Sequence, residues 1–273
     1  MKFETQITVG DKHQNKKITE LIAEQSTLSI ALIKQAMTKG AVWLKDSSGG
    51  KVRRIRRVGN KAKQGDTIYL YYDQSILDQQ PQVAELIADQ GSYSLWNKPQ
   101  GMLCQGSKWG DHCTINRWVE THLEPQRPAF IVHRLDRAAS GLILIAHKKK
   151  TATYFADLFE KRQIEKHYRA VVAGEFTQEQ IFNTDIDGKP ALTSAKLNHF
   201  DKSTNTSCLD IQIETGRKHQ IRKHLSQAGF PILGDRLYGN DKTTEKAPNL
   251  QLVSCYLAFQ CPEALCRKAF RLP

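Results

Sequence analysis

A carboxylate, Asp136, lies between two arginines, Arg134 and Arg137, in the segment HRLDR. Nearby cations favour the ionised form of a carboxyl group, so this side chain would be available as a nucleophile or as a base. The segment is bounded by two apolar runs, 130–132 and 142–146, which are typical of buried strands. A surface loop with a charge-satisfied aspartate fits the same pattern, because structural ion pairs also perturb carboxylates.

Three further stretches form compact patterns that contain basic residues. They read SLWNKPQG at 94–101, EKHYRA at 165–170, and TGRKHQIRKHL at 215–225 followed by GFPILGD at 229–235. Together with HRLDRAASGLIL, these blocks resemble in order and spacing the NKPxG, HRLD, KxY and GRxHQIRxH…GxPIxGD motifs of the RluA-type RNA pseudouridine synthases. The resemblance covers about 91–273. This chain departs from the family at Ala138-Ala139, where members commonly carry an Asp-Thr-like pair.

The resemblance implies a role for each central residue of these motifs. It makes Asp136 the catalytic carboxylate, acting either by covalent attack or by proton abstraction on a glycal-like route, and the sequence leaves the two routes open. It makes Arg222 the cation that keeps this carboxylate charged, Arg134 the side chain that aids base flipping, and Tyr168 the ring on which the flipped uracil stacks. Without the resemblance, Arg222 would be interpreted as a surface residue of an amphipathic helix, and Tyr168 as a core residue of a strand.

Basic residues accompany the same motifs and suit contacts with phosphate. In the region of the motifs the candidates are Lys98, Arg137, Lys166, Arg217, Lys218 and Lys223. Nearer the N-terminus the candidates are Arg53, Arg54, Arg56 and Arg57. The net charge of +12 and the pI of about 9.4 indicate a polyanionic partner, and structured RNA, ribosomal or transfer, is the simplest one. A basic protein with no such partner, or a charged strand edge at 51–57, remains the alternative.

Strands and helices mixed without regular βαβ alternation predict an α+β fold. The resemblance refines this to a catalytic domain with a mixed, largely antiparallel sheet flanked by helices. Strands are expected at 168–172, 192–200, 207–214 and 250–259, and helices at 151–162 and 218–228. On the second helix Arg222 is offset by about 100° from Ile221, which places it at the edge of the buried face.

The N-terminal region carries its own pattern. Apolar spacing predicts a helix from Ile18, and a second helix capped by Ser29 that ends before Gly40. Strands are expected at 41–44 and 67–72, whereas 1–15 shows little periodicity and is expected to be irregular. The arrangement resembles the S4 RNA-binding module, with a small α+β domain that does not touch RNA as the alternative. The expected division is an S4-like domain at 1–75, a linker at 76–90 and a catalytic domain at 91–273.

Composition limits the class of protein. Hydrophobic residues make up 40% and charged residues 25%, as in soluble globular proteins, and no apolar run of membrane-spanning length occurs. The start of the chain has no apolar signal region, and six cysteines without a CxxC pair suit a reducing compartment, so a cytoplasmic location is expected. The protein is also expected to be a monomer. No nucleotide-binding motif is present, and isomerisation needs no group donor, so no cofactor or metal is expected.

The expected activity is therefore isomerisation of specific uridines in RNA to pseudouridine. One alternative is a non-catalytic RNA-binding or ribosome-assembly protein that keeps the fold. Another is a hydrolase of glycosidic bonds, which usually needs two carboxylates about 5–10 Å apart. The motifs contain two aspartates, Asp136 and Asp235, and the second lies in a turn-like Gly-Asp pair.

Overall fold

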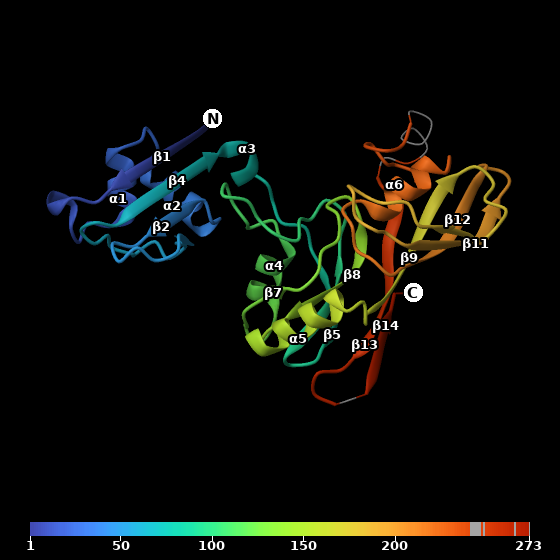
Figure 1. The fold of residues 1–273 in the computed structure, drawn as a ribbon. Coiled ribbons are helices and arrows are strands. Elements are labelled where there is room, and N and C mark those ends of the chain that lie inside the picture. The colour runs from blue at the N-terminus through green and yellow to red at the C-terminus, as the bar shows by residue number, and fades with distance from the viewer. Residues whose placement is uncertain (241–246, 248, 265, 273) are drawn as a thin grey trace. The chain divides into compact units, whose positions relative to one another are not determined.

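The structure, a computed structural model, describes residues 1–240, 247, 249–264 and 266–272. The chain divides into two compact units (Figure 1). The first unit comprises Met1–Pro81 and Gln105–Trp118, and the second comprises Gln82–Cys104 and Val119–Pro273.

The first unit is a four-stranded antiparallel sheet with two short helices on one face. The strand order is β1-β4-β2-β3. The strands are β1 (Lys2–Thr8), β2 (Val42–Lys45), β3 (Arg53–Arg54) and β4 (Thr67–Asp73). The helical elements are η1 (Asp11–His13), α1 (Ile18–Glu24), α2 (Ile30–Thr38) and α3 (Gln74–Leu77). The predicted helices from Ile18 and after Ser29 are thus confirmed.

Local signals explain how α2 begins and ends. The Ser29 hydroxyl accepts a hydrogen bond from the Leu32 amide, which satisfies one free amide of the first turn. Gly40 follows the helix with φ of +84°, a conformation that favours glycine. Ile33 and Met37 point into the core, where they meet the buried face of β4.

Two expectations for the N-terminal region are wrong. Residues 1–15 are not irregular, because β1 pairs with β4 along its whole length. Its alternation is hidden in the sequence because most of its side chains remain polar and only Ile7 is buried. The domain boundaries also differ, since 105–118 belongs to the first unit and the expected linker contains β5 (Glu85–Asp89).

The second unit is organised around a ten-stranded sheet with the order β10-β11-β12-β9-β13-β8-β6-β5, from which β14 pairs with β13 and β7 with β8. The remaining strands are β6 (Tyr93–Lys98), β7 (Phe130–Ile131), β8 (Ser140–Ala146), β9 (Glu165–Ala173), β10 (Gln180–Phe182), β11 (Thr193–Asp201), β12 (Thr206–Ile213), β13 (Leu252–Gln260) and β14 (Arg267–Arg271). The helices are α5 (Lys149–Glu160) and α6 (Gln220–Gln227), whereas α4 (Ile115–His122) begins in the first unit and ends in the second.

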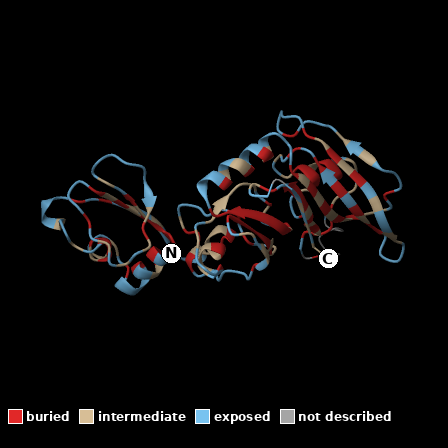
Figure 2. Ribbon diagram, turned by 90° about the horizontal axis from the view of Figure 1, so that it is seen from below, coloured by how far each residue is buried: buried red, intermediate tan, exposed pale blue. Residues whose placement is uncertain are grey.

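All pairings in this sheet are antiparallel except that between β8 and β13, so the predicted mixed, largely antiparallel sheet is confirmed. Figure 2 shows that buried residues are concentrated in the strands of this sheet. Tyr93, Phe155 and Phe259 meet edge to face between the sheet and α5, with ring centroids 5.0–5.7 Å apart. Among the described residues, no helix is both long and apolar enough to cross a membrane.

Candidate active site

Asp136 lies in the loop between β7 and β8. Its Oδ2 accepts a hydrogen bond from Arg222 Nη1 at 3.3 Å, and its Oδ1 lies 3.7 Å from His219 Nε2. The side chain keeps 24% of its surface exposed. The carboxylate is therefore held by a cation from α6 but is still open to an incoming group.

Arg222 is bound more tightly to a second carboxylate. Its Nε and Nη2 donate to the two oxygens of Asp235 at 2.8 and 2.7 Å, a bidentate arrangement in which Asp235 is only 1% exposed. Burial alone would raise the pKa of Asp235, but the hydrogen bonds from Arg222 and from backbone amides lower it. The sequence predicts that Arg222 forms an ion pair with Asp136. In the structure its closer partner is Asp235, and its remaining amino group, Nη1, donates to Asp136.

One pocket brings together the four central residues predicted from the motifs. It is lined by Arg134, Asp136, Tyr168 and Arg222, with Arg217 among the remaining residues. Tyr168 lies on β9 and is buried, and burial followed by the charge of Asp136 raises the pKa of its hydroxyl. Arg134 is exposed where it lines the pocket.

The turn after β6 supports the loop that carries Asp136. The buried ammonium of Lys98 donates to the carbonyls of Pro99, Met102 and Ala139 at 2.6–3.0 Å. The Gly101 amide donates to Arg137 O at 2.7 Å. Because these contacts engage backbone atoms, the loop is held in place without side-chain hydrogen bonds at Ala138-Ala139.

The predicted contact of Lys98 with phosphate is wrong. Its side chain has no exposed surface, and burial lowers its pKa to about 8. Lys166 is a second correction, because it is 6% exposed and its pKa is also lowered to about 8, by burial and then by Arg162. Both lysines lie on strands and are buried, so neither is placed to bind phosphate.

The other predicted phosphate contacts lie at the surface or are partly engaged. Arg137 and Lys218 are exposed, whereas Arg217 is half-buried with its Nε donating to Pro190 O at 3.0 Å. Lys223 forms an ion pair with Asp187 at 2.6 Å. In the first unit, Arg53 and Arg57 are exposed, whereas Arg54 and Arg56 form ion pairs with Asp111.

His219 belongs to the site although the sequence does not predict it as a site residue. It precedes α6 with φ of +58°, and this left-handed conformation turns its ring toward the pocket, with Nδ1 2.9 Å from the Tyr238 hydroxyl. Burial lowers its pKa, although Asp136 acts in the opposite direction. The sequence did contain one indication of this role, because His219 lies beside Gln220 and Arg222 in the motif KHQIR.

Two local features fix where the loop meets the sheet. Gly141 has φ of +110°, and a Cβ there would lie 2.2 Å from Ser254 O, so only glycine allows β8 to pair with β13 at this point. His133 accepts a hydrogen bond from the Leu144 amide at 2.9 Å, and burial lowers its pKa to about 3. This imidazole therefore stays neutral and serves as an acceptor that ties the loop to β8.

The fold is shared with solved pseudouridylate synthases. Human RNA pseudouridylate synthase domain containing 1 superposes with a TM-score of 0.57 at 22% identity, covering 71% of this chain and 86% of that one. The RNA pseudouridylate synthase family model matches residues 92–227, which include Asp136, Tyr168 and Arg222. The first unit up to Pro81 lies outside this match, so its S4-like character stays a prediction.

Relatives specify the family further. The chain is 30% identical over 189 residues to the dual-specificity RNA pseudouridine synthase RluA of Vibrio parahaemolyticus, covering 62% of this chain and 74% of that protein. It is 31% identical over 146 residues to ribosomal large subunit pseudouridine synthase D of Haemophilus ducreyi, covering 48% and 44%. An uncharacterized RNA pseudouridine synthase of Chloroflexus aurantiacus is 31% identical over 187 residues, covering 62% and 58%. The chain spans about half the length of the last two proteins. It belongs to the RluA-type RNA pseudouridine synthase family.

Proposed function

We propose that this chain isomerises specific uridines in structured RNA, ribosomal or transfer, to pseudouridine, and that it does so as a cytoplasmic monomer without a cofactor. The observation that carries the proposal is the accessible carboxylate of Asp136, held by Arg222 in a pocket that Tyr168 also lines. The reaction breaks the bond from the ribose to N1 of uracil, turns the base and rejoins it through C5. No atom is gained or lost.

Asp136 is proposed as the catalytic carboxylate. Covalent attack and proton abstraction both need its charged form, oriented toward the nucleotide. Arg222 supplies the orientation through its Nη1, while its other nitrogens are engaged by Asp235. This arrangement leaves the net charge of the three groups at –1, so the carboxylate is steered without being fully neutralised.

Arg134 and Tyr168 are proposed to act on the flipped nucleotide. A stacked uridine must leave its helix to reach the pocket, and a planar guanidinium suits the space that it vacates. The exposed side chain of Arg134 is free to enter an RNA helix. The raised pKa of Tyr168 keeps its hydroxyl protonated at neutral pH, so its proposed role is a wall for the base and not a proton acceptor.

The competing activities are less well supported. A glycosidic hydrolase would need a second working carboxylate, but Asp235 is buried and engaged on both oxygens by Arg222. A protein that only binds RNA would not need an accessible carboxylate facing a buried arginine. These points favour an isomerase over both alternatives.

The central test is Asp136→Asn, which keeps the shape and removes the charge. Pseudouridine formation in RNA from cells lacking the gene should fall below detection, while RNA affinity is retained. Asp185→Asn, which alters an exposed carboxylate of the same unit, is the matched control and should behave as the unaltered protein. Retention of more than a few per cent of the turnover would exclude Asp136 as the catalytic group. A modification map of the same cells with and without the gene identifies the target, and unchanged RNA mass separates isomerisation from base loss.

A further inference from the structure

The sheet of the first unit has one face packed on helices and one face that carries aromatic rings. Along β4 the buried Ile68 and Leu70 alternate with the half-buried Tyr69 and Tyr71. The two tyrosine rings are parallel, with centroids 6.3 Å apart. Trp43 on β2 pairs in register with Tyr69 and so lies on the same face. Aromatic side chains therefore line the sheet face opposite α1 and α2.

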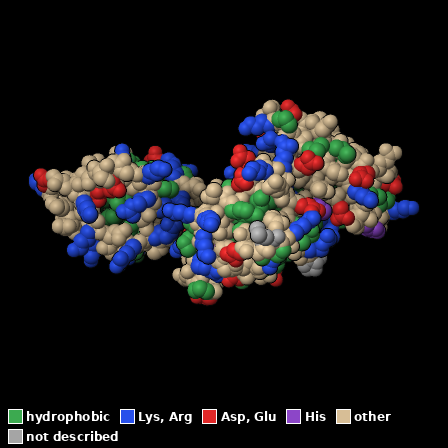
Figure 3. All heavy atoms as spheres, turned by 60° about the horizontal axis from the view of Figure 1, so that its bottom comes forward, with side chains coloured by type: hydrophobic (Ala, Val, Ile, Leu, Met, Phe, Trp, Pro, Cys, Tyr) green, Lys and Arg blue, Asp and Glu red, His purple; other side chains and the backbone are tan. Residues whose placement is uncertain are grey.

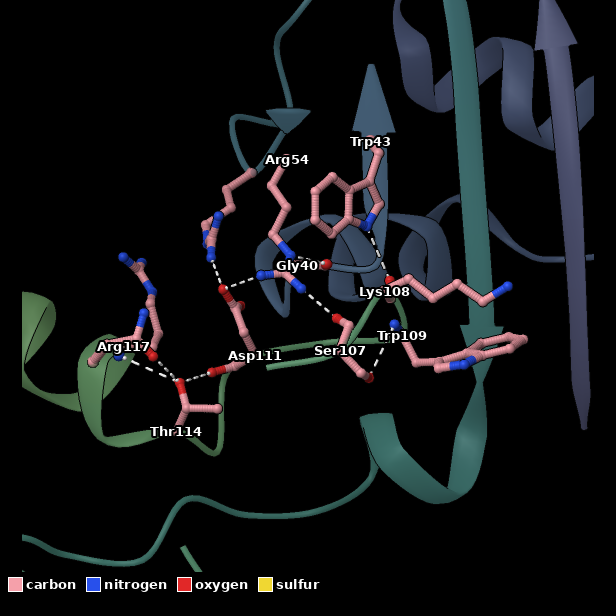
Figure 4. A network of polar contacts seen from close by, with 11 residues as sticks. Gly40, Trp43, Arg54, Ser107, Lys108, Trp109, Asp111, Thr114 and Arg117 are labelled. Atoms are coloured by element: carbon pink, nitrogen blue, oxygen red, sulfur yellow. Dashed lines mark hydrogen bonds and ion pairs between the residues drawn. The ribbon is translucent and has the colours of Figure 1, made fainter. Parts of the chain in front are cut away.

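A segment distant in the sequence adds a fourth ring to this face. Trp109 meets Tyr71 edge to face, with ring centroids 5.8 Å apart. The Trp43 indole donates to Lys108 O at 3.0 Å, which attaches the segment to β2 (Figure 4). We call the four side chains Trp43, Tyr69, Tyr71 and Trp109 the aromatic face.

The segment is held by ion pairs between the buried Asp111 and two partly buried arginines. Asp111 is reached by Arg54 at 2.8 Å and also by Arg56, and Arg54 donates further to Gly40 O at 2.9 Å (Figure 4). A Cβ at Gly40 would lie 2.3 Å from Asp111 Oδ1, so glycine is needed for this close approach. The Asp111 amide also donates to Lys39 O at 3.0 Å, so two arginines and the backbone anchor the segment two residues after Trp109.

Exposed cations lie over two of these rings, on flexible side chains that can move aside for a stacked base. The ammonium of Lys2 is 4.7 Å from the Trp109 ring centroid, and that of Lys108 is 4.6 Å from the Tyr71 centroid. The two side chains are 61% and 47% exposed. Lys108 pairs with the exposed Glu4 and can exchange it for phosphate at little cost, because exposed ion pairs contribute little to stability. Lys2 pairs with the buried Asp73, and its exposed ammonium adds positive charge to the same edge of the sheet.

The whole unit has the charge of a nucleic-acid-binding surface. Its two segments contain sixteen Lys and Arg against nine Asp and Glu, a net charge of +7. Figure 3 shows Lys and Arg side chains gathered over the side of this unit that it draws. The strand positions beside the tyrosines are polar, since Glu4 and Gln6 of β1 pair with Tyr71 and Tyr69. Rings among cations and polar groups match nucleic acid better than the apolar surface of a protein partner.

We propose that the aromatic face binds unpaired nucleotides of the substrate RNA, with bases stacked on Trp109 and Tyr71 and phosphates beside Lys2 and Lys108. This inference rests on the proposed function in taking RNA as the partner. Stacking on aromatic rings requires bases that are not enclosed in a duplex, whereas the flanking cations serve any sequence. The surface would thus select single-stranded regions near the target without reading their sequence.

The test measures the affinity of the full chain for a single-stranded adenosine-only oligoribonucleotide of about twelve nucleotides, a length within the span of known stacking surfaces. This probe has no uridine and so cannot be a substrate. Trp109→Leu should weaken binding by about 5-fold to 100-fold, as expected for loss of one stacked base, whereas Trp109→Phe should retain most of the affinity. Leu32→Ala, at an exposed position on α2, is the matched control on the helical face and should have no effect.

Tryptophan fluorescence gives a second measurement that does not depend on the stability of the leucine variant. The oligonucleotide should quench the emission of the unaltered protein, and this quenching should be reduced in the correctly folded Trp109→Phe variant. Three outcomes would overturn the proposal. The first is equal affinity of the Leu and Phe variants, and the second is tighter binding of a duplex of the same length. The third is weaker binding by Lys34→Gln on α2 while the changes at Trp109 have no effect. If the chain forms pseudouridine but these results fail, only the aromatic-face proposal is lost; if no RNA is modified, the proposed function itself fails.

Discussion

The lysines nearest to the aromatic face of the first unit are exposed, whereas several cations near the pocket of the second unit are buried. The first unit carries a net charge of +7 on 95 residues, and the second carries +5 on 178 residues. In the first unit the lysines Lys2 and Lys108 stay at the surface beside aromatic rings. The second unit buries three cations, which donate hydrogen bonds to backbone carbonyls or to carboxylates. They are Lys98, Lys166 and Arg222. Net charge therefore indicates an RNA partner for the whole chain, but only burial tells which cations can meet phosphate.

The largest effect is expected where an internal cation of the second unit is removed. Arg222→Leu leaves Asp235 buried without a counter-ion, which costs about 3–5 kcal/mol of unfolding free energy. Activity should be lost as well, because Asp136 loses the group that orients it. Chemical denaturation and pseudouridine formation measure the two effects.

A double variant separates stability from chemistry. Replacing both Arg222 and Asp235 by Leu removes the whole buried pair and should recover much of the stability but none of the activity. Recovery of activity in the double variant would mean that Arg222 is not needed to orient Asp136. A single variant as stable as the unaltered protein would contradict the buried geometry.

The second prediction removes the first unit. A chain that starts at Gln82 but keeps 105–118 lacks the partners of Asp111 and Trp109, and we expect it to aggregate or melt at a lower temperature. Replacing 105–118 by a short Gly-Ser linker in the same truncated chain should restore solubility and the fold of the second unit. Thermal melting and size-exclusion chromatography compare the two versions.

The linker version also tests the contrast in charge. Its RNA affinity should fall, and the slope of log affinity against log salt should flatten by about 0.7–0.9 for each phosphate group that the shortened chain no longer binds. Single-turnover conversion at saturating enzyme should change little. An unchanged salt slope would show that the first unit does not bind phosphate, and a chain that binds but cannot convert RNA would place part of the chemistry in the first unit.

The third prediction concerns acid. The pKa of Asp235 is lowered in the folded chain from its ordinary value of 3.8, so the folded state favours the charged form. Its contribution to stability is present above pH 3.8 and is lost as the pH falls through the lower folded value. Melting temperature should therefore decline more steeply below pH 4 in the unaltered protein than in the Leu double variant. Parallel declines would mean that the Arg222–Asp235 pair is not the group that titrates.

The smallest effect is expected at Tyr168. Tyr168→Phe keeps the buried ring and should change RNA affinity less than twofold, whereas Tyr168→Ala should weaken it by about 5-fold or more through loss of stacking. The phenylalanine variant also removes the hydroxyl, so its turnover reports any chemical role of that group. Indistinguishable affinities of two correctly folded variants would argue against stacking on this ring.

Much of the site could be predicted because its motifs are short and each lies on one element or turn. Asp136, Tyr168 and Arg222 each lie in a motif, and the sheet brings them to one pocket. The burial of Lys98 could not be predicted, because a lysine looks exposed until the three carbonyls around it are known. The role of Asp235 was missed for a similar reason, since its turn-like Gly-Asp pair hides a buried partner of Arg222.

The elements that could be predicted from the sequence are those defined by residues close together in the chain. Capping at Ser29 and the spacing of apolar residues identified α2 and most of the central strands. The strand β1 has a mostly polar outer surface, and it is defined only by its pairing with β4. The attachment of 105–118 to the first unit depends on the ion pairs of Asp111 with arginines more than fifty residues away, which no local pattern contains.

The attachment of 105–118 also sets an order of events during synthesis. The strands of the first unit are all present once Asp73 has been made, but the residues that complete the unit leave the ribosome only after β6 of the second unit. The chain crosses between the units three times, after Pro81, Cys104 and Trp118. A gene fusion with a single junction could not transfer the first unit intact to another protein. Transfer of the whole first unit to another protein would need two separate segments of the gene, 1–81 and 105–118.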